Sequence, residues 1–151
     1  MLKKIFLVIL GILLLLQFVP VDKTAPEYDS SKDYFANHQV DGNVKKIVMD
    51  ACYDCHSYQT KYPWYSNIAP VNFLINNHVK EGREHLNFSL WMEYPNKRKH
   101  HKLEECIEEI EKGNMPMKSF TWMHPEAKLS NEQKTILVSY FKEAFNAQPN
   151  E

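Results

Sequence analysis

The chain has 151 residues, of which 44% are hydrophobic and 13% aromatic, enough for one domain with an ordinary core. Its 18 basic and 19 acidic residues leave a net charge of −1, which argues against a nucleic-acid-binding protein. Four glycines and eight prolines exclude collagen-like and low-complexity classes.

The first predicted element is an apolar helix at the N-terminus. Lys3 and Lys4 precede a mainly apolar run over residues 5–19. Extended to residue 21, this run would form a helix of about 25 Å, somewhat short of the roughly 30 Å hydrocarbon core of a bilayer. We expect residues 1–21 to be a transmembrane anchor. A cleaved signal peptide is the alternative, but the nearest small residue, Ala25, lies between a lysine two positions earlier and a proline.

The charges beside this helix predict where the rest of the chain lies. The two N-terminal lysines place that end in the cytoplasm, so we expect a single-pass inner-membrane protein whose C-terminal part is periplasmic. If the helix were cleaved, the protein would be secreted to the periplasm. Residues 22–39 are polar and are expected to form a tether, followed by a domain over residues 40–147.

The strongest motif is the pentapeptide Cys52-Tyr-Asp-Cys55-His56, which has the C-x-x-C-H pattern of a haem c attachment site. Apolar residues recur at helical intervals after Asp41, so the motif is expected at the end of an amphipathic helix. One helical turn separates the two cysteines, which places their sulfurs to bond the two vinyl groups of one haem, while His56 binds the iron.

Three other interpretations of this motif remain open. A thioredoxin-like dithiol shares the C-x-x-C spacing, but no strand-rich pattern flanks it. A disulfide between Cys52 and Cys55 would not explain His56. A zinc site would need four ligands, which Cys106 and other histidines could complete.

A second axial ligand to the iron is expected from the segment around Met115, which lies between two predicted helices and precedes a proline. A methionine sulfur raises the reduction potential relative to a second histidine. Met117, His78 and His124 are the alternatives, as is a five-coordinate iron.

Aromatic residues with polar tips follow the motif, and we expect Tyr62 and Trp64 to wall the cofactor. Arg83 is a candidate partner for a haem propionate. The other nitrogen of the His56 ring needs an acceptor, for which a backbone carbonyl near Ala69 or Pro70 is our prediction.

Together these stretches resemble the haem-binding-domain family of small exported c-type cytochrome-like proteins, which are similar to class I cytochromes c. The resemblance implies covalent haem on Cys52, Cys55 and His56 and an exported location, and it covers about residues 26–146. It implies no particular substrate or partner. The matching stretches are Cys-Tyr-Asp-Cys-His-Ser-Tyr from Cys52, Tyr-Pro-Trp-Tyr-Ser-Asn-Ile-Ala-Pro from Tyr62, His-Val-Lys-Glu-Gly-Arg from His78, Leu-Asn-Phe-Ser from Leu86, Met-Pro-Met from Met115 and His-Pro-Glu-Ala-Lys-Leu-Ser from His124.

Periodicity predicts an all-α fold, a cytochrome c-like helical bundle around one covalent haem. The first helix ends in the haem motif, the second starts near Pro70 and stops before Gly82, and the third ends at Gly113 with Cys106 facing the core. The fourth starts at Ser130 with a capping box.

The expected function is one-electron transfer with redox partner proteins, which requires no acid, base or nucleophile, so we do not expect an enzyme. A haem-based sensor or small peroxidase with an open distal position is the alternative. A zinc-stabilised, membrane-tethered interaction module is a third interpretation.

Overall fold

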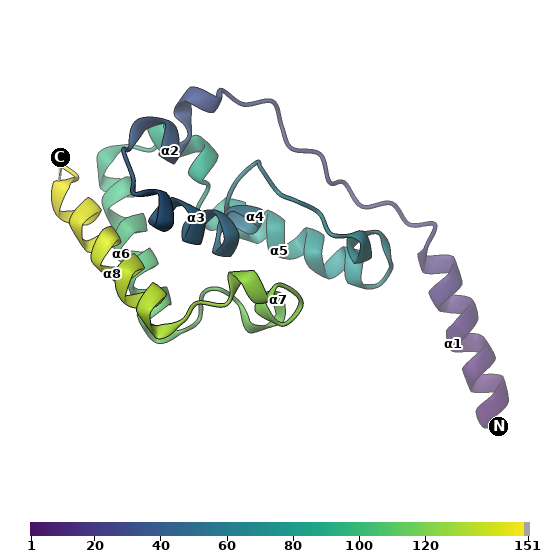
Figure 1. Cartoon of the computed structure of the whole chain (residues 1–151). Coiled ribbons are helices and arrows are strands. Elements are labelled where there is room, and N and C mark those ends of the chain that lie inside the picture. The colour runs from purple at the N-terminus through teal and green to yellow at the C-terminus, as the bar shows by residue number, and fades with distance from the viewer. Residues whose placement is uncertain (150–151) are drawn as a thin grey trace.

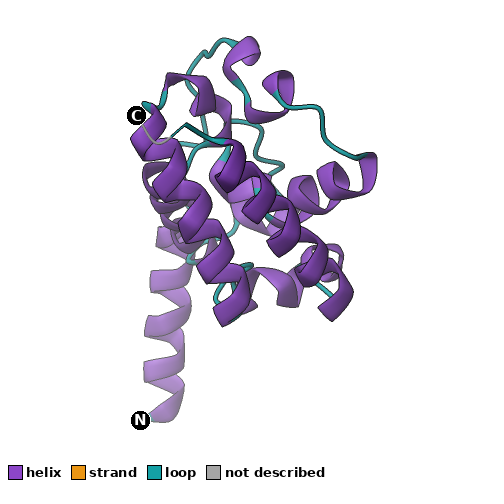
Figure 2. Cartoon of the chain, turned by 90° about the vertical axis from the view of Figure 1, so that its left-hand side faces the viewer, coloured by secondary structure: helices purple, strands orange, loops and turns teal. Residues whose placement is uncertain are grey.

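The computed structural model describes residues 1–149, and within that range the chain forms eight α-helices, four short 3-10 helices and no strand (Figure 1; Figure 2). The all-α prediction is therefore confirmed. A globular domain follows an isolated N-terminal helix, which projects away from it in both views.

The isolated helix, α1, spans Leu2–Leu16 and is shorter than the anchor predicted for residues 1–21. None of its residues is buried, and most of its large apolar side chains are exposed. At 1.5 Å per residue, α1 is about 22 Å long. No helix within residues 1–149 combines the length and the apolar content needed to cross a membrane, in contrast to the transmembrane helix that the sequence predicts.

The tether predicted for residues 22–39 is wrong in its second half. A 3-10 helix, η1 (Ser30–Lys32), and a short helix, α2 (Tyr34–Asn37), pack onto the domain. Tyr34 is only 1% exposed, its ring lies 4.9 Å from that of Trp91, and its hydroxyl lies 2.7 Å from that of Tyr140. These contacts bury an aromatic ring, which explains why the domain starts before residue 40.

The helix predicted to end in the C-x-x-C-H motif is instead two helices, α3 (Gly42–Ala51) and α4 (Tyr53–His56). The side chain of Asp41 accepts hydrogen bonds from the backbone of Asn43 and Val44, which starts α3. Cys52 lies between the helices with a φ of −126°. The change of direction there accompanies the burial of Tyr53, which is 1% exposed.

After the motif, the 3-10 helix η2 (Trp64–Asn67) leads into α5 (Val71–His85), and the 3-10 helix η3 (Phe88–Glu93) follows. The start of α5 beside Pro70 agrees with the sequence. Its end does not, because α5 continues through Gly82 for another three residues. Gly82 lies where α5 approaches the backbone of Cys55, so the glycine serves close packing rather than helix termination.

The remaining helices are α6 (Asn96–Lys112), α7 (Lys118–Met123), the 3-10 helix η4 (Pro125–Ala127) and α8 (Asn131–Ala147). Gly113 ends α6 with a φ of 71°, and Ser130 and Gln133 form the predicted capping box of α8. In Figure 1, α8 lies along α6. Cys106 of α6 packs against the core, as predicted.

The core lies where α3, α6 and α8 meet α2 and η3. It is rich in aromatic rings, and α4 contributes Tyr53 to it, so the C-x-x-C-H motif is attached directly to the packed interior. The buried members are Tyr34, Val44, Ile47, Val48, Tyr53, Leu86, Phe88, Trp91, Tyr94, Leu103, Ile110, Leu137 and Phe141.

Candidate functional site

The C-x-x-C-H motif comprises the single turn of α4 and Cys52, the residue that caps its start. The Cys52 carbonyl accepts hydrogen bonds from the backbone N–H of Cys55 at 3.2 Å and of His56 at 2.9 Å, which closes the turn. Both thiols are free and partly buried. Burial raises the pKa of Cys52 to about 12 and that of Cys55 to about 11, so both are neutral thiols at pH 7. A dithiol built for redox exchange needs a lowered thiol pKa, so this environment argues against the thioredoxin-like interpretation.

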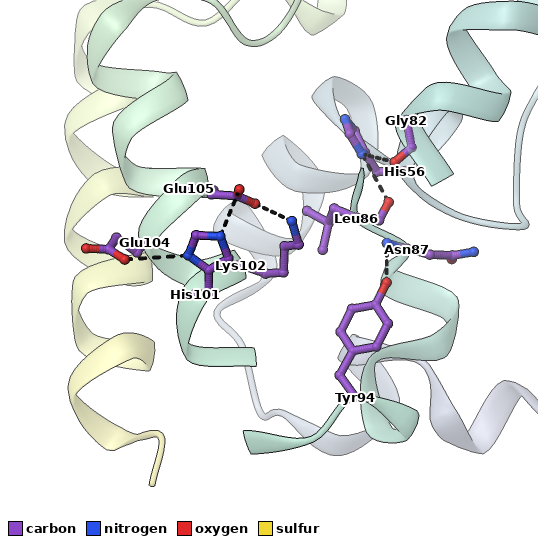
Figure 3. A network of polar contacts seen from close by, with 9 residues as sticks. All are labelled: His56, Gly82, Leu86, Asn87, Tyr94, His101, Lys102, Glu104 and Glu105. Atoms are coloured by element: carbon purple, nitrogen blue, oxygen red, sulfur yellow. Dashed lines mark hydrogen bonds and ion pairs between the residues drawn. The ribbon is translucent and has the colours of Figure 1, made fainter. Parts of the chain in front are cut away.

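His56 is oriented by two backbone carbonyls from the end of α5. Its Nδ1 lies 2.9 Å from the Gly82 oxygen and 3.1 Å from the Leu86 oxygen (Figure 3). Because both neighbours are acceptors, Nδ1 must carry the proton and Nε2 the lone pair. Burial lowers the pKa of His56, which favours the neutral imidazole that binds metals. Nε2 is therefore prepared to be a metal ligand.

The acceptors of the His56 proton differ from the prediction, which placed them near Ala69 or Pro70. Those residues precede α5, whereas α4 packs near the opposite end of that helix. The approach is close: a Cβ added to Gly82 would lie 2.7 Å from the Cys55 carbonyl oxygen. Gly82 therefore lets α5 contact the motif and supplies one of the two carbonyls.

Arg83 holds the segment that follows the motif. Its Nε donates to the Ser57 carbonyl at 2.8 Å and its Nη2 to Thr60 Oγ1 at 2.9 Å. The guanidinium carbon also lies 5.2 Å from the centre of the Tyr58 ring. The predicted contact of Arg83 with a propionate stays a prediction, and the structure adds this second role.

A buried polar group at Tyr53, inside the motif, was not predicted. The Tyr53 hydroxyl donates to Asp33 Oδ1 at 2.9 Å, and Gln59 Nε2 donates to Asp33 Oδ2 at 3.1 Å. The ring of Tyr53 stacks on that of Phe88 with centroids 5.1 Å apart. No local pattern links residues 33 and 53, so only the folded chain shows that the N-terminal segment supports the motif.

The candidate distal ligands lie in different settings. Met115 and Met117 follow Gly113, and both are partly buried; the Met115 N–H donates to the Glu109 carbonyl at 3.2 Å. His78 is partly buried on α5. Both nitrogens of His124 have partners, since Nε2 lies 2.6 Å from the Tyr65 hydroxyl and Nδ1 lies 3.0 Å from Glu126 Oε1. This arrangement argues against His124, while Met115 stays the prediction.

The two predicted aromatic wall residues are exposed to different degrees. Tyr62 is partly buried, and the Nζ of Lys23 lies 5.4 Å from its ring centre. Trp64 is 74% exposed on η2. The contact of either side chain with a cofactor stays a prediction.

The predicted zinc alternative finds no support. Among residues 1–149, no three His, Cys, Asp or Glu side chains are grouped so that they could hold a metal ion. A structural zinc ion needs four such ligands. Cys106 is instead buried against the core, and burial raises the pKa of its thiol.

The structure and the sequence define an all-α protein with a C-x-x-C-H motif at its core. A family model described as the haem-binding domain matches residues 11–143, and the chain belongs to that family. No curated protein and no solved structure matches the chain. The residues fit a haem, because one turn carries two free thiols and an imidazole whose Nε2 is the unprotonated nitrogen.

Proposed function

We propose that this chain is a monohaem c-type cytochrome domain that transfers single electrons. The observation that carries the proposal is the His56 ring, whose Nδ1 faces the Gly82 and Leu86 carbonyls beside two unpaired cysteines. A metal-binding histidine commonly donates its other N–H to such an acceptor, which fixes the ring and raises the basicity of the ligating nitrogen.

Cys52 and Cys55 would hold the haem through thioether bonds and His56 would hold its iron. When bound, the haem supplies a one-electron redox couple. The protein fixes the imidazole through the Gly82 and Leu86 carbonyls and fixes the segment after it through Arg83. Met115 would be the second residue to hold the iron, and its sulfur would give a higher reduction potential than a histidine would.

The cofactor is tested by purifying the protein from cells that can attach haem c. We expect the intact mass to increase by one haem and the pyridine haemochrome spectrum to show thioether-type bands. Cys52→Ala with Cys55→Ala should abolish covalent haem, whereas Cys106→Ala, which removes the cysteine outside the motif, should retain it. A colourless wild-type protein would refute the proposal.

The distal ligand is tested with Met115→Ala and, as the matched control, Met117→Ala. We expect only the first to remove the methionine-to-iron charge-transfer band and to lower the reduction potential. A band that survives Met115→Ala would exclude Met115. Carbon monoxide binding by the untreated ferrous protein would show an open distal position and would favour the sensor or peroxidase alternative.

We also propose that the domain lies outside the cytoplasm at the inner membrane, where it meets its redox partner proteins. Supporting this, most side chains of α1 are apolar and exposed, and Lys3 and Lys4 lie in its first turn. We propose that α1 is buried in lipid. Digestion of the domain by protease added to spheroplasts would support this location, and complete protection would contradict it.

A further inference from the structure

The chain that follows α1 is bonded to one corner of the domain. Gln17 Nε2 donates to the Ala69 carbonyl at 3.1 Å, and the Ala69 N–H donates to Gln17 Oε1 at 3.0 Å. The side-chain amide thus pairs with both polar groups of one residue, as a neighbouring peptide would. These two bonds join the residue that caps the end of α1 to the segment between η2 and α5.

A second attachment lies six residues further along the chain. Lys23 Nζ donates to Ser66 Oγ at 3.0 Å and to Asn67 Oδ1 at 2.6 Å, and it lies 5.4 Å from the centre of the Tyr62 ring. Both ends of the segment 17–23 therefore contact the segment 62–69. In Figure 1, α1 accordingly lies nearest to the end of the domain where α5 begins.

Four large apolar side chains are exposed around Ala69, and we name them the η2–α5 corner. Trp64 is 74% exposed, Ile68 44%, Val71 40% and Leu74 54%. Val71 and Leu74 are three residues apart on α5 and share one face. Single exposed apolar residues are common on soluble proteins, but a group of them marks an interaction surface.

We propose that the η2–α5 corner rests on the lipid bilayer that α1 enters. This inference depends on the proposed burial of α1 in lipid. The bonds of Gln17 place the exposed apolar surface of the corner next to that of α1, so a bilayer covering the helix would also meet the corner. The ring of Trp64 has an apolar body and a polar N–H, which suits the boundary between headgroups and hydrocarbon. For Trp64, this lipid contact would replace the cofactor contact predicted from the sequence.

The consequence is a fixed orientation of the domain. A helix joined by a free tether would let the haem motif face any direction, whereas two attachments and a membrane contact would hold α5 against the lipid. Because the far end of α5 orients His56, the same helix would set the position of the motif relative to the membrane.

The test uses the full-length haem-loaded protein with Cys106→Ala as background. A nitroxide spin label is attached at Val71→Cys and, as the control, at Ser139→Cys, an exposed position on α8. Vesicles of phosphatidylcholine with a minority of phosphatidylglycerol are added. At position 71 we expect collisions with a water-soluble nickel chelate to fall several-fold and collisions with oxygen to rise. Position 139 should not change.

Co-sedimentation with the vesicles is measured in parallel, because it shows whether the protein binds the bilayer at all. Protein that does not sediment would overturn the burial of α1, whereas bound protein whose label at 71 still meets the chelate would overturn only the corner contact. A label already shielded before vesicles are added would mean that haem or a second copy covers the corner, and would also overturn it.

Gln17→Ala tests the part assigned to that residue. The variant should still sediment with vesicles, because α1 keeps its apolar side chains, but the label at position 71 should regain access to the chelate. Equal shielding in Gln17→Ala and in the parent would overturn the role of the Gln17–Ala69 bonds.

Discussion

At the scale of single residues, Gly82 shows how closely α5 and the haem motif fit. Its Cα faces the backbone of Cys55, which cannot rotate away as a flexible side chain can. The C-x-x-C-H pattern alone predicted that Cys52, Cys55 and His56 form the candidate cofactor site. The carbonyls that receive the His56 proton lie 26 and 30 residues later in the chain, so no local pattern could reveal them.

We predict that Gly82→Ala separates α5 from α4. The added methyl group would lie 2.7 Å from the Cys55 carbonyl oxygen. Overpacking of this kind lowers the unfolding free energy by about 1–3 kcal/mol. Urea unfolding should show this loss, and the reduction potential of the haem-loaded protein should shift as the His56 hydrogen bonds lengthen. Gly42→Ala is the control, since a Cβ there meets no atom within 4 Å. Equal unfolding free energies of Gly82→Ala and wild type would contradict the prediction, because α5 and α4 would then accommodate the methyl group without cost.

A second prediction concerns the hydroxyl group of Tyr53. Tyr53→Phe removes the hydrogen bond to Asp33 but keeps the stacked ring, and we expect unfolding free energy to fall by about 1–2 kcal/mol with unchanged haem content. Tyr58→Phe is the control, because the Tyr58 hydroxyl makes no hydrogen bond within residues 1–149. A similar loss in both variants would contradict the role of the Asp33 bond.

At the scale of elements, the sequence predicted helices best where their ends carry chemical signals. Ser130 and Gln133 start α8, and Gly113 ends α6 in the left-handed conformation that glycine favours. The break at Cys52 and the continuation of α5 through Gly82 were missed, because tertiary packing rather than local preference decides them. The short helices α2 and α7 carry too few residues to show a period.

The start of α8 gives a third prediction. Ser130→Ala should lower the unfolding free energy by about 1 kcal/mol, because the side chain no longer accepts the Gln133 N–H. Ser139→Ala, on the exposed side of the same helix, should be neutral or slightly stabilising, since alanine has the higher helix propensity. Thermal unfolding of the two variants compares them directly, and equal melting temperatures would show that the cap contributes nothing.

At the scale of the whole molecule, the boundary of the domain is the main correction to the sequence prediction. Polar composition indicated a tether over residues 22–39, yet Asp33 and Tyr34 are buried. A polar segment with one or two aromatic residues gives no periodic signal, and its burial depends on η3 and α8, which lie far along the chain.

We therefore predict that two N-terminal truncations differ. A chain that begins at residue 27 should keep the stability of the domain. A chain that begins at residue 40 lacks the buried Tyr34. Loss of a large buried aromatic side chain lowers the unfolding free energy by about 3–5 kcal/mol. Denaturant unfolding of the two haem-loaded chains measures the difference. Matching midpoints would mean that residues 27–39 are dispensable for stability.

The Gly82 carbonyl has two partners, and through them the His56 ring is linked to the motion of a helix end. It accepts the Leu86 N–H at 2.9 Å, which closes the final turn of α5, and also faces His56 Nδ1 at 2.9 Å. Helix termini fray more readily than helix interiors. Each fraying event at His85 would thus loosen the imidazole, and if His56 holds the haem iron as proposed, warming would change the electronic character of that iron before the domain unfolds.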